Sequence, residues 1–451
     1  MSTLRLTPGP HPAIALPTDD EQFRQLAHRL IPGGAHTYSR GDDQLPAEAP
    51  ACFVRAKAGR AWDLHGRDFV DWGMGINNVI VGHAEDVIDD AAIAAIHNGI
   101  AFTRPTLLEI EAAQALLPLF PGMDMIKFGK NGSDINTAAI RLARAITGRS
   151  LVAYDGSAPF LSIHDWFIGT TVVNAGVPEA VSSLSVPLVY NDLASVEAMF
   201  ASHPNDIAIV VLEVCREKKP AAGFLEGLRH LCDRHGTLLL FDEIITGFRY
   251  ALHGAHALFG VVPDLLSIGK AMANGYAVTA MLGKRKYMER GGLHHDQERV
   301  FLLSTTNGPE QSALAAAVAT TRFYHEHDVI GHVAAVGQRL IDGLAEAATR
   351  HGMGAHISAV SDFGCRPAPI YCGPNGAPSM PYRTLFLQEL LRRGVFMPWI
   401  CPCFRHGASE IDQTLDAFDH ACRVYARAIE AGSVDGFLVG PAVKPVFRKF
   451  N

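Results

Sequence analysis

The chain has 451 residues, a length that allows roughly two to three domains and a large hydrophobic core. Apolar residues make up 48% of the chain and charged residues 19%, a balance that excludes an intrinsically disordered protein. The 46 acidic and 39 basic side chains give a formal charge of −7, which argues against nucleic acid as a partner and is compatible with a cationic substrate.

The eight cysteines are scattered along the chain, so we expect reduced thiols rather than a disulfide framework. The close pair Cys401 and Cys403 lacks a second pair at zinc-site spacing, and no metal site is predicted. The N-terminus has no basic start with a long apolar run, and no apolar stretch reaches about 18 residues. Neither export nor membrane insertion is expected, and a cytoplasmic location follows.

The elements expected along the chain divide it into three segments. Residues 1–84 are rich in Pro and Thr at the start, become amphipathic at 21–30, and show short apolar pieces typical of hairpins at 53–72. Residues 85–330 alternate strand-like and helix-like patterns, which predicts a mostly parallel sheet wrapped by helices. Residues 331–451 contain helical patterns at 333–347 and 384–393, which predicts a smaller lobe joined by the N-terminal segment.

A candidate phosphate-binding loop occupies residues 129–134, between a strand-like run at 125–128 and a helical pattern at 138–147. The free N–H groups and positive dipole end of a helix N-terminus suit a dianion. Glycine-rich turns before helices are mostly structural, so this loop needs a second signal to count as a site.

Two further strand-like runs precede acidic residues. The run 151–154 is followed by Asp155 and then by a long loop at 157–163, for which a substrate-shaping role and a plain surface insertion are equally open. The run 207–212 is followed by Glu213.

The second signal comes from an aspartate and a lysine. Asp242 closes the apolar run 237–241, at the strand end where open α/β sheets bind ligands, and Lys270 follows in the run 263–276. A lysine amine forms a Schiff base with an aldehyde cofactor, and an aspartate keeps the ring nitrogen of that cofactor protonated. Each residue alone is more often a surface lysine or a helix cap. Together they predict pyridoxal 5′-phosphate chemistry.

The segment 241–249, with Pro263-Asp264 and residues 267–270, resembles the class III aminotransferases, especially the glutamate-1-semialdehyde aminomutase-like branch. The resemblance extends from about Ile31 to the C-terminus. It implies an α/β fold of the fold type I transferases, with a mostly parallel seven-stranded sheet flanked by helices and a smaller α+β domain built from both terminal segments. It also implies a homodimer with shared active sites.

The resemblance assigns Lys270 and Asp242 as catalytic residues that also bind the cofactor. Residues 131–134 match the phosphate loop of the family, with the Gly132 amide and the Ser133 hydroxyl as ligands and the role of Asn131 open. The remaining cofactor contacts that it implies are Tyr154 stacking on the ring, Glu213 bordering it, Ile244 beneath it, and Thr305 or Thr306 at the phosphate of the partner subunit's cofactor.

The substrate is predicted from the ends of the chain. Residues 31–40 resemble the aminomutase start, where Arg40 would hold a carboxylate, whereas residues 41–46 and 444–451 resemble the branch that aminates sugars and aminoglycoside antibiotics. Asp42 and Asp43 could bind ammonium groups or be solvated turn residues. The predicted substrate residues are Tyr38, Arg40, Asp42 and Asp43.

The predicted activity is therefore an amino-group transfer on an amino sugar, closest to a gentamicin-type enzyme acting at C6′ of an aminoglycoside, with glutamate or glutamine as amino donor. Three alternatives stay open: glutamate-1-semialdehyde 2,1-aminomutase, an epimerase at an amine-bearing carbon, and a cofactor-binding scaffold without catalysis. Epimerisation would need a second acid–base group, for which Tyr38, His36 or a cysteine is a candidate.

Overall fold

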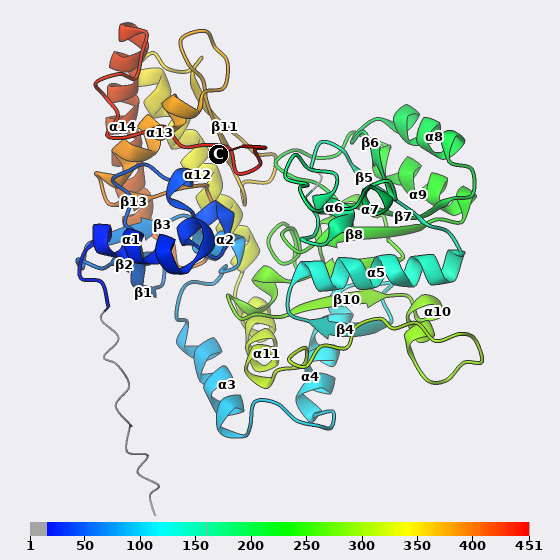
Figure 1. Cartoon of the computed structure of the whole chain (residues 1–451). Helices are drawn as coiled ribbons and strands as arrows, with labels where there is room; N and C mark the ends of the chain where they lie inside the picture. Colours follow the sequence, from blue (N-terminus) through cyan, green and yellow to red (C-terminus); the bar gives the residue numbers. More distant parts are fainter. Residues whose placement is uncertain (1–15, 159, 451) are drawn as a thin grey trace, which may run out of the picture.

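The computed structural model describes residues 16–158 and 160–450 (Figure 1). Residues 1–15, which hold most of the Pro- and Thr-rich start of the chain, lie outside the described residues. The α-helices are α1 (Asp20–Leu30), α2 (Met74–Asn77), α3 (Asp86–His97), α4 (Leu107–Leu116), α5 (Gly132–Thr147), α6 (Asp165–Ile168), α7 (Glu179–Ser182), α8 (Leu193–Ser202), α9 (Phe224–His235), α10 (Arg285–Met288), α11 (Gln311–Glu326), α12 (Val329–Arg350), α13 (Met380–Leu391) and α14 (Ala408–Ala431).

A seven-stranded sheet forms the centre of the larger part. Its order is β4 (Met125–Gly129), β10 (Thr279–Gly283), β9 (Leu265–Ile268), β8 (Leu238–Glu243), β7 (Ile207–Leu212), β5 (Leu151–Asp155) and β6 (Ser185–Leu188). β10 runs antiparallel to β4 and β9, and the remaining neighbours pair in parallel. The predicted fold class is confirmed.

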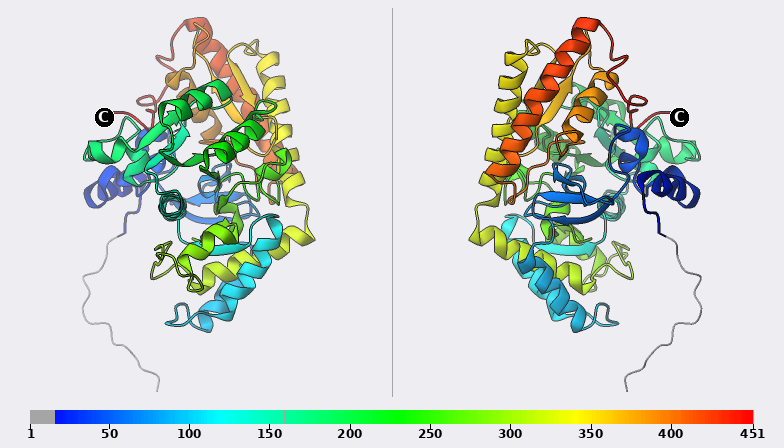
Figure 2. Two further views of the ribbon diagram at one scale, coloured as in Figure 1. Left: turned by 90° about the vertical axis from the view of Figure 1, so that its right-hand side faces the viewer. Right: turned by 90° about the vertical axis from the view of Figure 1, so that its left-hand side faces the viewer.

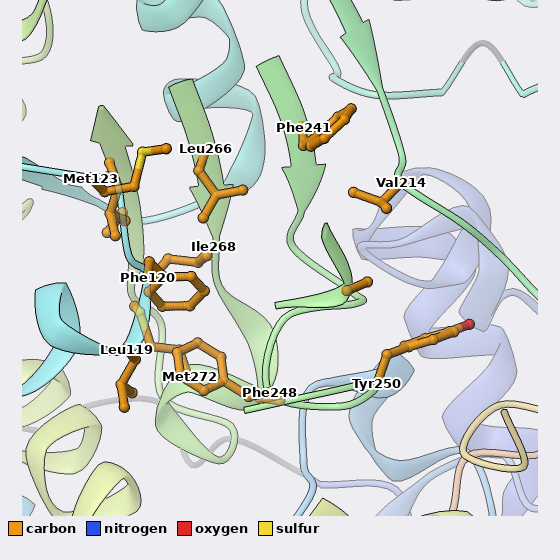
Figure 3. Packing of buried hydrophobic residues seen from close by; sticks show 14 of the residues in the cluster. Leu119, Phe120, Met123, Val214, Phe241, Phe248, Tyr250, Leu266, Ile268 and Met272 are labelled. Atoms are coloured by element: carbon orange, nitrogen blue, oxygen red, sulfur yellow. The ribbon is translucent and has the colours of Figure 1, made fainter. Parts of the chain in front are cut away.

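The central strands are buried on both faces, as parallel sheets covered by helices require. In β7, Val210 and Leu212 point into one hydrophobic cluster while Ile209 and Val211 point into another that includes side chains of α5. Figure 3 shows part of the first cluster, where Ile268 and Met272 lie beside Phe120. Alternation of side chains along each strand therefore divides the core into two layers.

The smaller part joins both ends of the chain (Figure 2). Strands β1 (Phe53–Lys57), β2 (Arg60–Asp63) and β3 (Asp68–Asp71) form the predicted hairpins, and β13 (Val395–Phe396) adds in parallel to β3. Helices α12, α13 and α14 pack around a separate hydrophobic cluster, with a two-stranded sheet of β11 (Ile357–Val360) and β12 (Ala368–Tyr371). The predicted segment boundaries, after residues 84 and 330, stay predictions. The boundary after residue 330 falls in the first turn of α12.

All eight cysteines are free, and seven of them are buried. Within residues 16–158 and 160–450, no cluster of three or more His, Cys, Asp or Glu side chains could hold a metal ion. In the same ranges, no helix combines the length and the apolar character that crossing a membrane requires.

Candidate active site

Acidic side chains gather at the carboxyl edge of the parallel strands. Asp155 ends β5, Glu213 follows β7, and Asp242 lies one residue before the end of β8. The register pairs Leu212 of β7 with Phe241 of β8, and Asp242 with Ser267 of β9. Glu213, just after β7, and Asp242, on β8, are therefore neighbours at the ends of adjacent strands.

Asp242 is 7% exposed and is held by two hydrogen bonds. Asn136 Nδ2 donates to Oδ2 at 2.7 Å, and the backbone N–H of Ile244 donates to Oδ1 at 3.0 Å. Burial raises the pKa of the Asp242 carboxyl, while these two hydrogen bonds and the charge of Lys270 act in the opposite direction. A buried carboxylate of this kind calls for a cationic partner.

Lys270 lies two residues beyond β9, in a backbone conformation with φ of 45° that is uncommon for a residue with a side chain. Ile268 and Met272, two residues before and after Lys270, are fully buried in the first hydrophobic cluster, which holds this conformation in place. Burial lowers the pKa of the Lys270 amine, and the carboxylates of Asp242 and Glu213 oppose that shift. A lowered pKa favours the neutral, nucleophilic amine.

The loop before α5 supplies N–H groups and a hydroxyl. Asn131 is the N-cap of α5: its side chain accepts from the N–H of Asp134 at 3.2 Å, and Asp134 accepts from the N–H of Asn131 in return. Asn131 therefore caps α5, and its contact with the cofactor stays a prediction. Ser133 Oγ accepts from the N–H of Ile163 at 2.9 Å and still has its own hydrogen to donate.

Ile244 lies between the phosphate-loop candidate and the lysine segment. A Cβ at Gly132 would stand 3.2 Å from Ile244 Cγ1, and a Cβ at Gly269 would stand 3.0 Å from Ile244 Cδ1. Because neither glycine has a Cβ, the start of α5 and the segment just before Lys270 can both pack closely against the side chain of Ile244. The structure brings Gly132, Ile244, Asp242 and Lys270 into one site.

Tyr154, the predicted stacking residue, lies on the face of the sheet that α5 covers, the same face from which Asp242 bonds Asn136. It is packed with the α5 side of the sheet, with its ring 6.3 Å from that of Phe167. The loop that follows β5 also contacts the site: the carbonyl of Leu161 accepts from Asn136 at 2.7 Å, and the N–H of Ile163 donates to Ser133 Oγ at 2.9 Å. The stacking role of Tyr154 stays a prediction.

An arginine that the sequence analysis did not single out bridges two of the strand-end acids. Arg216 pairs with Asp155, and its Nε lies 3.2 Å from Glu213 Oε2. Burial raises the pKa of Glu213, with Arg366 and Arg216 opposing. Asn136 was also missed, although it lies four residues after Gly132 and so on the same helix face.

The predicted substrate residues Tyr38 and Arg40 and the predicted inter-subunit residues are on the surface of this single chain. Arg40, Thr305 and Thr306 are exposed, as is Tyr38. Their roles stay predictions.

The two predicted substrate aspartates already have cationic partners. Asp42 pairs with Arg24 at 3.4 Å and His28 at 3.0 Å, and Asp43 pairs with Arg448 at 2.5 Å. A substrate ammonium group would have to compete with these side chains, and the predicted ammonium binding stays a prediction.

These residues fit pyridoxal 5′-phosphate. Lys270 offers an amine of lowered pKa, the buried Asp242 offers a carboxylate for a protonated ring nitrogen, and the capped N-terminus of α5 offers N–H groups for a phosphate. Ile244, which approaches both Gly132 and Gly269, places an apolar surface between these parts.

Comparisons with known proteins agree. The profile of the family described as aminotransferase class-III matches residues 43–364. A 3-aminobutyryl-CoA aminotransferase of Cloacimonas acidaminovorans (strain Evry) is 33% identical over 417 residues, covering 87% of this chain and 93% of that protein. A glutamate-1-semialdehyde 2,1-aminomutase of Syntrophobacter fumaroxidans is 33% identical over 416 residues, covering 88% and 95%.

Among solved structures, the FumI protein of Sphingopyxis sp. MTA144 superposes with a TM-score of 0.84 at 27% identity, covering 92% of this chain and 99% of that one. The predicted enzyme class and cofactor are confirmed at the level of the family. The chain belongs to the class-III aminotransferases, which depend on pyridoxal 5′-phosphate.

Proposed function

We propose that the protein exchanges an amino group and an oxo group between an amino donor and an amine-bearing sugar. The observation that carries the transfer chemistry is the meeting of Lys270, Asp242 and the N-terminus of α5 around Ile244. Pyridoxal 5′-phosphate, when bound there, supplies an electron sink for the amine-bearing carbon of the substrate.

Lys270 is the proposed covalent anchor and acid–base group. Because burial lowers its pKa, its Nζ can accept a proton from the amine-bearing carbon and deliver it to another position. Asp242, oriented by Asn136 and the N–H of Ile244, holds the proton on the cofactor's ring nitrogen. Gly132 and Ser133 bind the phosphate at the start of α5.

The amino-sugar substrate is supported by an arrangement that joins three segments. The backbone N–H of Lys444 donates to the carbonyl of Asp43 at 2.8 Å, which brings the segment that begins at Lys444 against residues 41–46. Phe447 lies 5.4 Å from Phe160 of the loop after β5, measured between ring centroids. That loop contacts Asn136, which bonds Asp242.

The two segments that resemble the sugar-aminating branch therefore lie against each other and against the loop that reaches the cofactor site. We propose C6′ of an aminoglycoside intermediate as the reacting carbon and glutamate or glutamine as the amino donor. The cytoplasmic location stays part of the proposal.

A homodimer with shared sites is proposed as well. Helices α3 and α4 and the segment between them expose large apolar side chains: Val87, Ile93, Ile96, Ile100, Phe102, Leu107 and Ile110. Soluble monomers rarely leave such a patch uncovered. In that dimer, Thr305 and Thr306 would reach the phosphate of the other copy's cofactor.

The first experiment locates the cofactor. The enzyme is reduced with borohydride and digested, and the modified peptide is sequenced by mass spectrometry. The cofactor mass is expected on Lys270, and Lys270→Ala is expected to abolish turnover. Lys286→Ala, which changes an exposed lysine over the Tyr287 ring, is the matched control and is expected to retain activity. Modification at another lysine would overturn the assignment.

The second experiment identifies the substrate. The enzyme loaded with glutamate is offered a 6′-oxo aminoglycoside, glutamate 1-semialdehyde or 3-oxobutyryl-CoA, and the aminated product is measured. Amination of the aminoglycoside alone supports the proposal. Conversion of the semialdehyde would favour the aminomutase alternative. Deuterium uptake at an amine-bearing carbon of the aminoglycoside, without amino transfer, would favour epimerisation.

A further inference from the structure

A cavity of about 260 Å³ lies between the N-terminal segment, the start of α13 and the C-terminal segment. Ser39 and Gln44 line it from one side, Arg383 and Trp399 from another, and Lys444 from a third. The two terminal segments meet here, since the N–H of Lys444 donates to the carbonyl of Asp43 at 2.8 Å, and their ribbons run near each other in Figure 2. The volume suits a small molecule rather than a macromolecular partner.

The lining of this cavity is positively charged. Arg383 and Lys444 contribute two cations, and no Asp or Glu lines the cavity. Asp43, the acid next to Gln44 in the sequence, is paired with Arg448. Across the described part of the chain, neither Arg383 nor Lys444 has a carboxylate within 4.0 Å. The positive charge of the lining is therefore left uncompensated by the protein.

Arg383 is the less exposed of the two cations. Its Nη2 donates to the carbonyl of Pro398 at 3.0 Å, which occupies one of its five N–H donors. Removing a guanidinium from water without an anionic partner is unfavourable, and burial accordingly lowers the pKa of Arg383. An anion with two or more oxygens would satisfy the remaining donors.

The neutral groups of the lining suit the same kind of ligand. The Ser39 hydroxyl and the Gln44 amide can each donate to an oxygen atom, and Gln44 is 7% exposed. Trp399 is anchored by a hydrogen bond of 3.0 Å from its Nε1 to the carbonyl of Gly73. Its ring gives the cavity a rigid apolar wall, against which the carbon skeleton of a small ligand can pack.

We propose that this cavity binds an anionic group, a carboxylate or a phosphate, of a small molecule, with Arg383 and Lys444 as the charged contacts and Ser39 and Gln44 as neutral donors. Its lining shares no residue with the group around Lys270, and the inference goes beyond the proposed amino transfer. Its occupant bridges residues 39–44 to residues 444–446, so binding also fastens the C-terminal segment.

The experiment titrates the cofactor-bound enzyme, whose phosphate loop is filled, with inorganic phosphate in one arm and glutarate in the other at constant ionic strength. Binding is measured by calorimetry and by tryptophan fluorescence. Saturable binding of either anion is expected, weakened about tenfold by Lys444→Gln and by at least as much by Arg383→Gln. The two arms tell a phosphate site from a carboxylate site.

The control variants separate this site from general charge effects. Lys449→Gln removes a lysine from the same tail, beside Phe450, and is expected to leave both affinities unchanged. Trp399→Phe is expected to remove the fluorescence response and to keep the calorimetric signal. Arg383→Lys keeps the charge and is expected to bind the anions more tightly than Arg383→Gln does. It also replaces Arg383→Gln in the comparison if that variant folds poorly.

Absence of saturable binding, or equal affinities in wild type, Lys444→Gln and Arg383→Lys, would overturn the proposal. So would equal weakening by Lys449→Gln. None of these measurements depends on turnover. A failure of the amino-transfer assay therefore leaves the result for this cavity readable.

Discussion

The side-chain amide of Asn136 joins two parts of the site: its Nδ2 donates to Asp242 Oδ2 at 2.7 Å and to the carbonyl oxygen of Leu161 at 2.7 Å. Asn136 is fully buried on α5. One amide nitrogen carries two hydrogens, so it can serve both acceptors at once. The orientation of the strand-end carboxylate and the position of the loop after β5 therefore depend on the same residue.

Replacing Asn136 by Ala is expected to lower kcat about tenfold or more, because Asp242 loses a hydrogen bond that stabilises its charged form. The loss also raises the pKa of Asp242 further, so the acid limb of the pH–rate profile is expected to move to higher pH. Steady-state kinetics between pH 5 and pH 9 measure both effects. Asn174→Ala, at an exposed position, is the control; equal profiles for the two variants would contradict the bridging role.

Replacing Asp242 by Asn is expected to leave the cofactor bound while slowing proton transfer about a hundredfold. The neutral amide cannot hold a proton on the ring nitrogen, whereas the phosphate contacts at α5 are untouched. Cofactor content from absorbance and single-turnover rates with an amino donor are the two readouts. A normal rate at full occupancy would remove Asp242 from the catalytic group.

Replacing Gly269 by Ala is expected to displace the segment that carries Lys270. An added Cβ would stand 2.7 Å from Thr279 Cγ2 and 3.0 Å from Ile244 Cδ1, closer than carbon atoms pack. The substitution is expected to reduce kcat/KM sharply. Combining it with Thr279→Ser removes Cγ2, keeps the hydroxyl that bonds the carbonyl of Asn131 at 3.2 Å, and is expected to restore part of the activity.

Thr279→Ser alone is the matched control and is expected to behave as wild type. If the double variant is no more active than Gly269→Ala, steric contact with Thr279 is not the cause of the loss.

His406 makes stability depend on pH. Its ring lies 3.9 Å from that of Trp72, and its Nδ1 accepts from the N–H of Cys403 at 3.0 Å. Burial lowers its pKa from 6.5 to about 4. The unfolded chain therefore takes up a proton near pH 6.5 that the folded chain refuses until about pH 4, so this contribution to stability is present above pH 6.5 and is lost as the pH falls.

Between pH 7 and pH 5 the free energy of unfolding is expected to fall by about 2 kcal/mol through this residue. Urea titrations followed by tryptophan fluorescence measure it. His406→Gln is expected to be less stable at pH 7 and to show a smaller fall between the two pH values. His294→Gln, at an exposed histidine, should reproduce the wild-type difference; an unchanged pH dependence in His406→Gln would exclude His406 as the cause.

Local sequence was sufficient for the family and the main elements. The buried run before Asp242, the glycine-rich start of α5 and the segment around Lys270 are continuous in the chain, and their strand and helix patterns are set by neighbouring residues. The fold class and the enzyme class followed from them and were confirmed. The roles of Lys270 and Asp242 stay predictions, though the structure brings the two together.

Only the tertiary structure decided which distant side chains meet. Asn136 and Asp242 are 106 residues apart, and the Asp43–Arg448 pair joins opposite ends of the chain. No local periodicity encodes such contacts, because they depend on how strands order in the sheet and where the C-terminal segment returns. The same reason explains why the sequence patterns did not show the ion pairs of the two aspartates near the N-terminus: Asp42 meets Arg24, and Asp43 meets Arg448 of the returning C-terminal segment.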